Sequence, residues 1–420
     1  MIKEKLQNIK SSHQANLENQ GSDNLQQGWE IKKLGEVCKV IAGQSPEGKF
    51  YNSKGIGMPF YQGKKEFSEK YIGEPTTWTT KITKEAEAGD VLMSVRAPVG
   101  PVNFSTQKIC IGRGLAAIRA GKNIDKEFLY NFLIKHENEI EGNAGAVFNS
   151  INKTQIEAIA IPLPPLHEQQ RIVSILDEAF AAIAKAKANA EQNLKNAKEL
   201  FESYLQEVFD PSTRSGQGKK GDGWEVRTLG ELCVFTQGIQ RDVKLQSETK
   251  GENQVRFLRI VDYTQGNEPP RYIDFPGEKY ILNTDDVALV RYGASTGFVC
   301  RGLEGALANN LFRVIPKSTG KLTNDFLFIF LRSPLFQNAI KATMNGAAMP
   351  AISFSLIEGI PFPLPPLKEQ QTIVRQLDAL RAETQKLEAI YQKKIDNLEE
   401  LKKSILQKAF SGELSGGEPV

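Results

Sequence analysis

The sequence contains few of the residues that metal sites and acid–base catalysis usually need. It has 4 cysteines and 3 histidines among 420 residues, and no two cysteines form a CxxC pair. This scarcity argues against a zinc site and fits a reducing compartment. His167 lies in a motif that occurs twice, and the second copy has Lys368 at the same position. The sequence therefore predicts no metal site and no catalytic residue.

Long apolar runs are also missing, and the charge is nearly balanced. No stretch approaches the roughly 20 apolar residues that span a bilayer, and the polar N-terminus lacks the apolar core of a signal peptide. We therefore expect a cytoplasmic protein with no membrane partner. The net charge of +3 neither demands nor excludes nucleic acid, because a local basic face matters more than the total.

A long internal repeat is what the sequence does contain. PLPPLHEQQRIVSILDEA begins at Pro162, and PLPPLKEQQTIVRQLDAL begins at Pro363, 201 residues further along the chain. GWEIKKLGEVC at Gly28 is similarly matched by GWEVRTLGELC at Gly223. The spacing indicates two copies of one plan, each a globular part of variable length followed by a segment of fixed length.

The globular parts have the features of α+β domains. Short β-branched runs at Val91–Val95, Phe257–Val261 and Val287–Val290 alternate with glycine and proline turns, which predicts strands. One helical stretch stands out in each copy, at Phe128–Ile134 and Phe326–Leu331. The predicted fold class is therefore α+β, with two related globular domains separated by two long helices.

The fixed segments have the pattern of a coiled coil. Apolar residues recur at alternating steps of three and four, without proline or glycine, over a helix of roughly 55 Å. Two helices of equal length would most simply pack as an antiparallel pair, and the alternative is a lone amphipathic helix on each domain. The predicted seam comprises Ile172, Leu176, Ile183, Phe201, Ile373, Leu377, Leu380, Leu387, Leu398 and Ile405.

These patterns predict domain boundaries along the whole chain. The globular domains are expected at 28–161 and 223–360, and the long helices at 162–210 and 361–412. The remaining segments are predicted to be an N-terminal tail (1–27), a Gly- and Ser-rich linker (211–222) and a C-terminal tail (413–420).

This plan resembles the specificity subunit of type I restriction–modification enzymes. The resemblance rests on the two PLPPL-x-EQQ-x-IV motifs with their helices, and on IGRGLAAIR (111–119), LANNLFRV (307–314) and GAAMPAIS (346–353). It implies two target-recognition domains on double-stranded DNA and a chain that is itself non-catalytic. It also implies two methyltransferase subunits and restriction subunits as partners. S-adenosylmethionine, ATP and Mg would then bind to those partners, and no cofactor would bind to this chain.

The resemblance also suggests why the helices keep their length while the globular domains diverge. Two domains on a rigid helical pair would each recognise one half of a bipartite target, with half-sites near one helical turn, ~34 Å, apart. The sequence gives neither half-site nor the number of base pairs between them.

Candidate DNA contacts follow from the base preferences of polar side chains. Arg and Lys suit guanine, and Asn and Gln suit adenine, but any one of these residues could equally be a solvated charge or a phosphate contact. The candidates in the first domain, each near a glycine-marked loop, are Gln44, Lys64, Lys65, Arg96 and Arg113. Those in the second domain are Gln240, Arg241, Arg256, Arg259, Arg291, Tyr292 and Asn310.

Other functions have weaker support. Gly43–Lys49 matches part of the phosphate-binding loop G-x4-G-K-[ST], but Phe50 replaces the hydroxyl residue and no apolar strand is evident before it. A self-sufficient methyltransferase or nuclease would need a catalytic domain for which the repeats leave no room. A coiled-coil scaffold without DNA specificity remains the main alternative, and salt-dependent DNA binding would distinguish the two.

Overall fold

The computed structural model describes residues 28–142, 150–210, 223–344 and 351–414. The predicted tail at 1–27, the linker at 211–222 and residues 415–420 lie outside the described residues. The chain divides into a first unit, residues 1–190 with 393–420, and a second unit, residues 191–392. Each unit therefore contains one globular domain and a part of both long helices.

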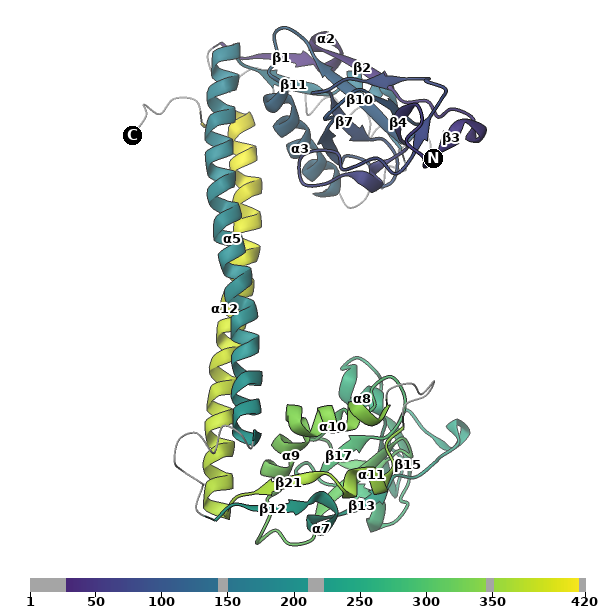
Figure 1. Cartoon of the computed structure of the whole chain (residues 1–420), viewed down its shortest axis with the longest axis vertical. Coiled ribbons are helices and arrows are strands. Elements are labelled where there is room, and N and C mark those ends of the chain that lie inside the picture. The colour runs from purple at the N-terminus through teal and green to yellow at the C-terminus, as the bar shows by residue number, and fades with distance from the viewer. Residues whose placement is uncertain (1–27, 143–149, 211–222, 345–350, 415–420) are drawn as a thin grey trace. The chain divides into compact units, whose positions relative to one another are not determined.

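Three sheets, one of them a two-stranded ribbon, and several helices form the globular domain of the first unit (Figure 1). The four-stranded sheet is antiparallel, and Cys38, Val40, Val91 and Met93 from it pack in the same core as Phe128 of α3 (Lys126–Gly142). In order, it comprises β2 (Cys38–Ala42), β10 (Leu115–Ala120), β7 (Val91–Ser94) and β8 (Val102–Phe104). The five-stranded sheet comprises β3 (Tyr51–Asn52), β5 (Trp78–Thr79), β4 (Met58–Tyr61), β9 (Ile109–Ile111) and β6 (Glu85–Ala86).

The globular domain of the second unit repeats this plan. Its first sheet comprises β13 (Cys233–Gln237), β20 (Leu311–Pro316), β17 (Val287–Val290) and β18 (Val299–Cys300). Its second sheet comprises β15 (Arg271–Asp274), β14 (Gln254–Leu258), β19 (Gly305–Leu307) and β16 (Ile281–Leu282). Helices α9 (Asn324–Arg332) and α10 (Pro334–Met344) place Phe326 and Phe336 in its core. The predicted α+β class is confirmed.

One predicted strand has the wrong bounds. The run Phe257–Val261 was expected to be a single strand, but β14 ends at Leu258 and a short helix, α8, covers Ile260–Thr264. Asp262, the third residue of α8, accepts a hydrogen bond from the Arg259 backbone N–H at 2.7 Å. That contact satisfies a free N–H at the helix start and explains why the chain turns there.

The two repeated motifs pair with each other within each unit. In the first unit, β1 (Glu30–Lys33) pairs with β11 (Ala160–Leu163), so the segment after Gly28 lies beside the start of the proline motif. In the second unit, β12 (Glu225–Thr228) pairs with β21 (Pro361–Leu364) in the same register. Both motifs recur in the sequence because each is half of one antiparallel ribbon.

A buried glutamine in each proline motif fixes the start of the long helix. Gln169 is fully buried; its side-chain oxygen accepts from the Asp125 N–H at 2.8 Å, and its amide donates to the carbonyls of Asn123 and Pro164. Gln370 makes the corresponding bonds to Thr323, Lys321 and Pro365. Each amide thus attaches its long helix to the loop that precedes α3 or α9.

The long helices start later than the predicted bounds of 162 and 361, which lie in strands β11 and β21, but each is longer than the predicted length of roughly 55 Å. Helix α5 covers Leu166–Phe209 (44 residues) and α12 covers Leu367–Ser411 (45 residues), or about 66 Å each at 1.5 Å per residue. The prediction of roughly 55 Å counted only the apolar repeat after Ile172. The helix in fact begins directly after the prolines, because Pro165 offers its carbonyl to the N–H groups of Glu168 and Gln169.

The two helices pack together in an antiparallel manner within each unit (Figure 1). In the first unit Lys187 forms an ion pair with Glu399 and Arg171 donates to the Leu414 carbonyl. In the second unit the Tyr204 hydroxyl lies 3.3 Å from the Gln376 side-chain oxygen. The residue number on α12 falls as the number on α5 rises, so the predicted antiparallel coiled coil is confirmed.

The buried seam differs from the predicted one at Leu387, which is 37% exposed. Thr384 is buried, and the next inward-facing residue is the half-buried Glu388. The inward positions Leu380, Thr384 and Glu388 are therefore four residues apart each time, before a step of three to Tyr391. A straight helix drifts away from a strict heptad, and an extra step of four restores the alignment. Among the other seam candidates, Ile172, Leu176, Ile183, Ile373 and Leu377 are buried, whereas Phe201, Leu380, Leu398 and Ile405 are half-buried.

Candidate nucleic-acid interface

The same set of loops meets beside the sheets in both globular domains. In the first, the Gly43 N–H donates to the Leu115 carbonyl at 2.9 Å and the Gln44 N–H to the Ile111 carbonyl at 2.9 Å. In the second, the Gly238 N–H donates to Leu311 at 3.0 Å and the Ile239 N–H to Leu307 at 2.7 Å. A Cβ at Gly43 or Gly238 would lie 2.1 Å from a facing carbonyl oxygen. Only glycine therefore permits this approach of the two loops.

Three further backbone bonds match between the domains and complete the alignment. The Val95 N–H donates to the Gly114 carbonyl at 2.9 Å, and the Arg291 N–H donates to the Asn310 carbonyl at 2.8 Å. The Gly112 N–H donates to the Tyr61 carbonyl, and the Ala308 N–H donates to the Leu258 carbonyl. Leu115 and Leu311 donate to Gly112 and Ala308 in the same way. Gln44 therefore corresponds to Ile239, Gln62 to Arg259, Arg96 to Tyr292 and Arg113 to Asn309.

In the first domain these loops bring the predicted cations together. Lys64, Arg96 and Arg113 line one cavity of about 480 Å³, although they come from three distant parts of the sequence. Gln44 and Lys65 are exposed, and in the sequence they directly adjoin the cavity residues Ser45 and Lys64. Within the described residues, none of the four predicted cations of this domain forms an ion pair with a carboxylate. These cations are Lys64, Lys65, Arg96 and Arg113. The cavity therefore presents uncompensated positive charge to solvent, as contacts with DNA would require.

Two residues of this cavity were missed by the sequence analysis. Ser45 Oγ accepts from the Arg113 backbone N–H at 3.2 Å, and Gln62 is an exposed amide on the loop after β4. Both residues lie near glycines, Gly43 and Gly63, that mark other candidates in the sequence. Only the arrangement of the loops in space shows that these two side chains belong to the same cavity.

The arginines predicted in the second domain have a different environment. Arg259 forms a two-pronged ion pair with Asp262, at 3.0 and 3.2 Å, and Arg256 approaches the same carboxylate at 3.3 Å. The Asp262 side chain is fully buried. These two guanidinium groups thus balance an internal charge, which holds α8 against β14.

Arg291 is also held from within the domain. Its guanidinium donates to the Gln237 side chain and to the Ile352 carbonyl, and it lies over the Phe354 ring at 5.5 Å. A DNA contact by Arg256, Arg259 or Arg291 would compete with these bonds, so we rank them below the other candidates. Their part in DNA binding stays a prediction.

The remaining candidates are two amides, a phenol and one arginine, Arg241. Gln240 is exposed and accepts from the Asn309 amide at 3.4 Å, and Tyr292 occupies the position of Arg96. The side-chain oxygen of Asn310 is buried without a hydrogen-bond partner among the described residues. Arg241 follows Gln240 and is half-buried. Asn309, which corresponds to Arg113, was missed by the sequence analysis and becomes visible only when the two repeats are aligned.

The loop at Gly43–Lys49 is not built as a phosphate-binding loop. A strand, β2, does come directly before it, contrary to the prediction from the sequence. The loop ends in a 3-10 turn over Gly48–Phe50, and Lys49 forms an ion pair with Glu47 at 2.7 Å. A strand–loop–helix arrangement that would aim N–H groups at a phosphate is therefore missing from this described segment.

The described residues show neither a metal cluster nor a membrane span. In these parts of the chain, no group of three or more histidine, cysteine, aspartate or glutamate side chains is placed to hold a metal ion. The helices described here also lack the combination of length and apolar character that crossing a bilayer requires.

Comparison with known protein families decides the assignment of the repeats. A family model for the type I restriction modification DNA specificity domain matches the chain twice, over residues 26–195 and 221–400. The chain belongs to this family. Each match of the specificity domain contains one globular domain and most of the long helix that follows it, so the resemblance seen in the sequence is confirmed.

Individual relatives match this chain over different lengths. A Methanocaldococcus jannaschii protein assigned as the MjaX specificity subunit of a type I restriction enzyme is 42% identical over 186 residues, a stretch that spans 43% of each chain. The MjaIX specificity subunit from the same organism is 24% identical over 92% of this chain and 93% of its own length. A solved chain of a type I R-M system has a TM-score of 0.75 at 22% identity, covering 93% and 99% of the two chains, which shows a shared fold.

Proposed function

We propose that this chain is the DNA specificity subunit of a type I restriction–modification enzyme, with one half of a bipartite target recognised by each globular domain. The supporting observation is the pair of matched loop sets that present different side chains. Five backbone hydrogen bonds are the same in both, yet Arg96 and Arg113 in one set correspond to Tyr292 and Asn309 in the other. One scaffold with two sets of polar groups suits two different half-sites.

The catalytic steps would belong to partner subunits. Two methyltransferase subunits would dock on equivalent faces of the two repeats, since like partners require like surfaces. They would bind S-adenosylmethionine and flip the target base out of the duplex. Restriction subunits would supply ATP- and Mg-dependent translocation and cleavage. In this proposal the present chain binds none of these cofactors.

Methylation mapping after co-expression with the cognate methyltransferase subunit tests the proposal. We expect a bipartite motif, two short defined halves around an unspecified gap. A continuous motif would mean that only one domain recognises bases. Stable co-purification without methylation, and without salt-dependent DNA binding, would favour a scaffold that has no DNA specificity.

A variant in one loop set sharpens this test. Arg113→Ala should relax the sequence preference at one position of one half-site, at a cost of ~1–3 kcal/mol in binding, because a bidentate contact to a base is lost. The other half-site should keep its sequence. Lys49→Ala, which removes an exposed lysine already paired with Glu47, is the matched control. Equal loss at both half-sites would contradict the assignment of one half-site to each domain.

A further inference from the structure

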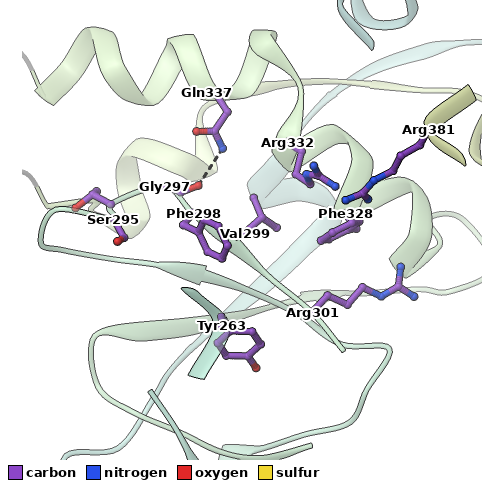
Figure 2. Close-up of a pocket in the computed structure, with 11 residues that line it drawn as sticks. Tyr263, Ser295, Gly297, Phe298, Val299, Arg301, Phe328, Arg332, Gln337 and Arg381 are labelled. Carbon is purple, nitrogen blue, oxygen red and sulfur yellow. Dashed lines mark hydrogen bonds between the residues drawn. The ribbon is translucent and has the colours of Figure 1, made fainter. Parts of the chain in front are cut away.

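A second charged cavity lies in the second unit. It has a volume of about 650 Å³, and three arginines line it together with Phe328 and Gln337. Arg301 follows β18, Arg332 ends α9, and Arg381 projects from α12. Figure 2 shows Arg332 and Arg381 converging beside the Phe328 ring.

The positive charge in this cavity is only partly balanced. Arg301 forms ion pairs with Asp325 at 2.6 Å and Asp285 at 3.4 Å. Arg332 and Arg381 have no carboxylate in ion-pair range among the described residues. Burial, and then the charge of Arg381, lower the pKa of Arg332, whereas the charge of Glu202 raises it. Two guanidinium groups therefore lie together at a partly buried site without an anion of their own.

Contact with the Phe328 ring orients the guanidinium groups of Arg332 and Arg301. The Phe328 ring lies 5.2 Å from the Arg332 guanidinium carbon and 5.5 Å from that of Arg301. Such contacts hold the planar groups in fixed orientations while leaving their N–H groups available. A guanidinium held in this way can donate two parallel hydrogen bonds to an oxyanion.

At the same place in the first unit, apolar and aromatic side chains replace the three arginines. The cations near these rings are lysines: Lys70, which pairs with Glu127, lies 5.9 Å from the Tyr130 ring, and Lys402 lies 5.3 Å from the Phe180 ring. The strand registers show that Phe104 of the first unit corresponds to Arg301 of the second. The spacing of the repeats gives three further correspondences between the first and second units: Tyr130 with Phe328, Ile134 with Arg332, and Phe180 with Arg381. Phe104 and Tyr130 stack with ring centres 4.6 Å apart. The neighbouring segment covers them, because the backbone of Phe104 bonds to Lys70 and Ile72, both at 2.9 Å. The arginine cavity is therefore a property of the second unit.

We propose that Arg332 and Arg381 form a binding site for a phosphate group of the DNA backbone at the second half-site. This inference rests on the proposed function. The loop between β17 and β18 contains Tyr292 of the matched loop set and then Ser295 to Phe298, which line the arginine cavity. One loop thus joins a base-facing position to the phosphate site, as expected where backbone contacts flank base contacts.

The asymmetry between the units argues against a carboxylate of a partner subunit as the ligand. Two like methyltransferase subunits would need equivalent faces on both repeats. Arginines in one copy and phenylalanine and isoleucine in the other are not equivalent. Two different half-sites impose no such equivalence, and an extra phosphate contact can exist on one side alone.

The test compares the salt dependence of DNA binding by the complete methyltransferase complex containing either wild-type chain or Arg381→Gln. Loss of one phosphate contact should reduce the slope of log K against log[salt] by about 0.9 and weaken binding several-fold at low salt, with an unchanged methylation motif. Arg332→Gln should act in the same direction, and Arg381→Lys should keep the slope. Arg375→Gln, an exposed arginine on the same helix, is the control.

Each other outcome overturns the inference in a recognisable way. An unchanged slope for both glutamine variants would exclude a phosphate contact while the wild-type bipartite motif still supports the proposed function. Loss of complex assembly in sedimentation, with normal melting of the isolated chain, would identify a partner carboxylate instead. A wild-type complex without a bipartite motif would refute the proposed function itself.

Discussion

At the residue scale, one buried amide in each long helix connects the helix to its globular domain. The two glutamines of each EQQ motif have opposite environments: Gln169 is fully buried with three hydrogen bonds, whereas Gln170 is exposed. Gln169→Ala should lower the free energy of unfolding by about 3 kcal/mol, because it leaves backbone groups of Asn123, Asp125 and Pro164 unpaired. Thermal unfolding of both variants measures this difference. Equal stability of Gln169→Ala and the control Gln170→Ala would contradict it.

The cysteines provide a second prediction at the residue scale. Burial raises the pKa of Cys38, Cys233 and Cys300 to about 12. Their thiolates, the reactive species, should be roughly 1,000-fold rarer at pH 8 than in the unfolded chain. Above pH 9 the folded state keeps these thiols protonated, whereas the unfolded chain loses the protons. The raised pKa values therefore contribute to the free energy of unfolding below pH 9, and this contribution is lost as the pH rises towards 12. Native alkylation at pH 8 should therefore spare these cysteines, and alkylation in urea should modify them; rapid native labelling would contradict this burial.

At the scale of elements, each long helix ends in the core of the other repeat's globular domain. Helix α12 ends in the first globular domain, and α5 ends in the second. Phe410, near the end of α12, lies 5.0 Å from Phe128 and 5.6 Å from Phe132, measured between ring centres. Phe209, at the end of α5, makes the corresponding contacts with Phe326 and Phe330. Each unit therefore depends on a segment from a distant part of the sequence.

Removing one of these rings should destabilise one unit selectively. Phe410→Ala should cost ~3–5 kcal/mol in the first unit, since a large buried side chain leaves a cavity. Hydrogen exchange should quicken in α3 and β10 while β17 and β20 keep their protection. Leu401→Ala, at a position of α12 that is 46% exposed, is the control and should change neither. Equal effects on both units would show that they unfold as one.

At the scale of the whole molecule, the equal lengths of α5 and α12 predict how the target is spaced. Inserting one heptad at paired positions of both helices lengthens them by about 10 Å, close to three base pairs of DNA. The unspecified gap in the methylation motif should then grow by about three base pairs, with both half-sites unchanged. Insertion into one helix alone should disrupt the packing and abolish methylation. An unchanged gap after the paired insertion would mean that the helices do not set the spacing.

The sequence by itself determined the repeat, the α+β class and the antiparallel helical pair. These properties depend on patterns that persist over many residues: matched motifs 201 positions apart and an apolar period that continues for ten turns. Such signals average over local exceptions. The error at Leu387 arose because a single shift of the period is small compared with the pattern around it.

Only the tertiary structure decided which polar residues face outward together. Arg113 and Arg291 look alike in the sequence, yet Arg113 is exposed in a cavity with Lys64 and Arg96, whereas Arg291 bonds to Gln237 and Ile352. Arg332 and Arg381 gave no signal, because one ends a short helix and the other lies on a charged helix surface. The charge environment of a side chain depends on neighbours brought near by folding, and that proximity is not a property of the local sequence.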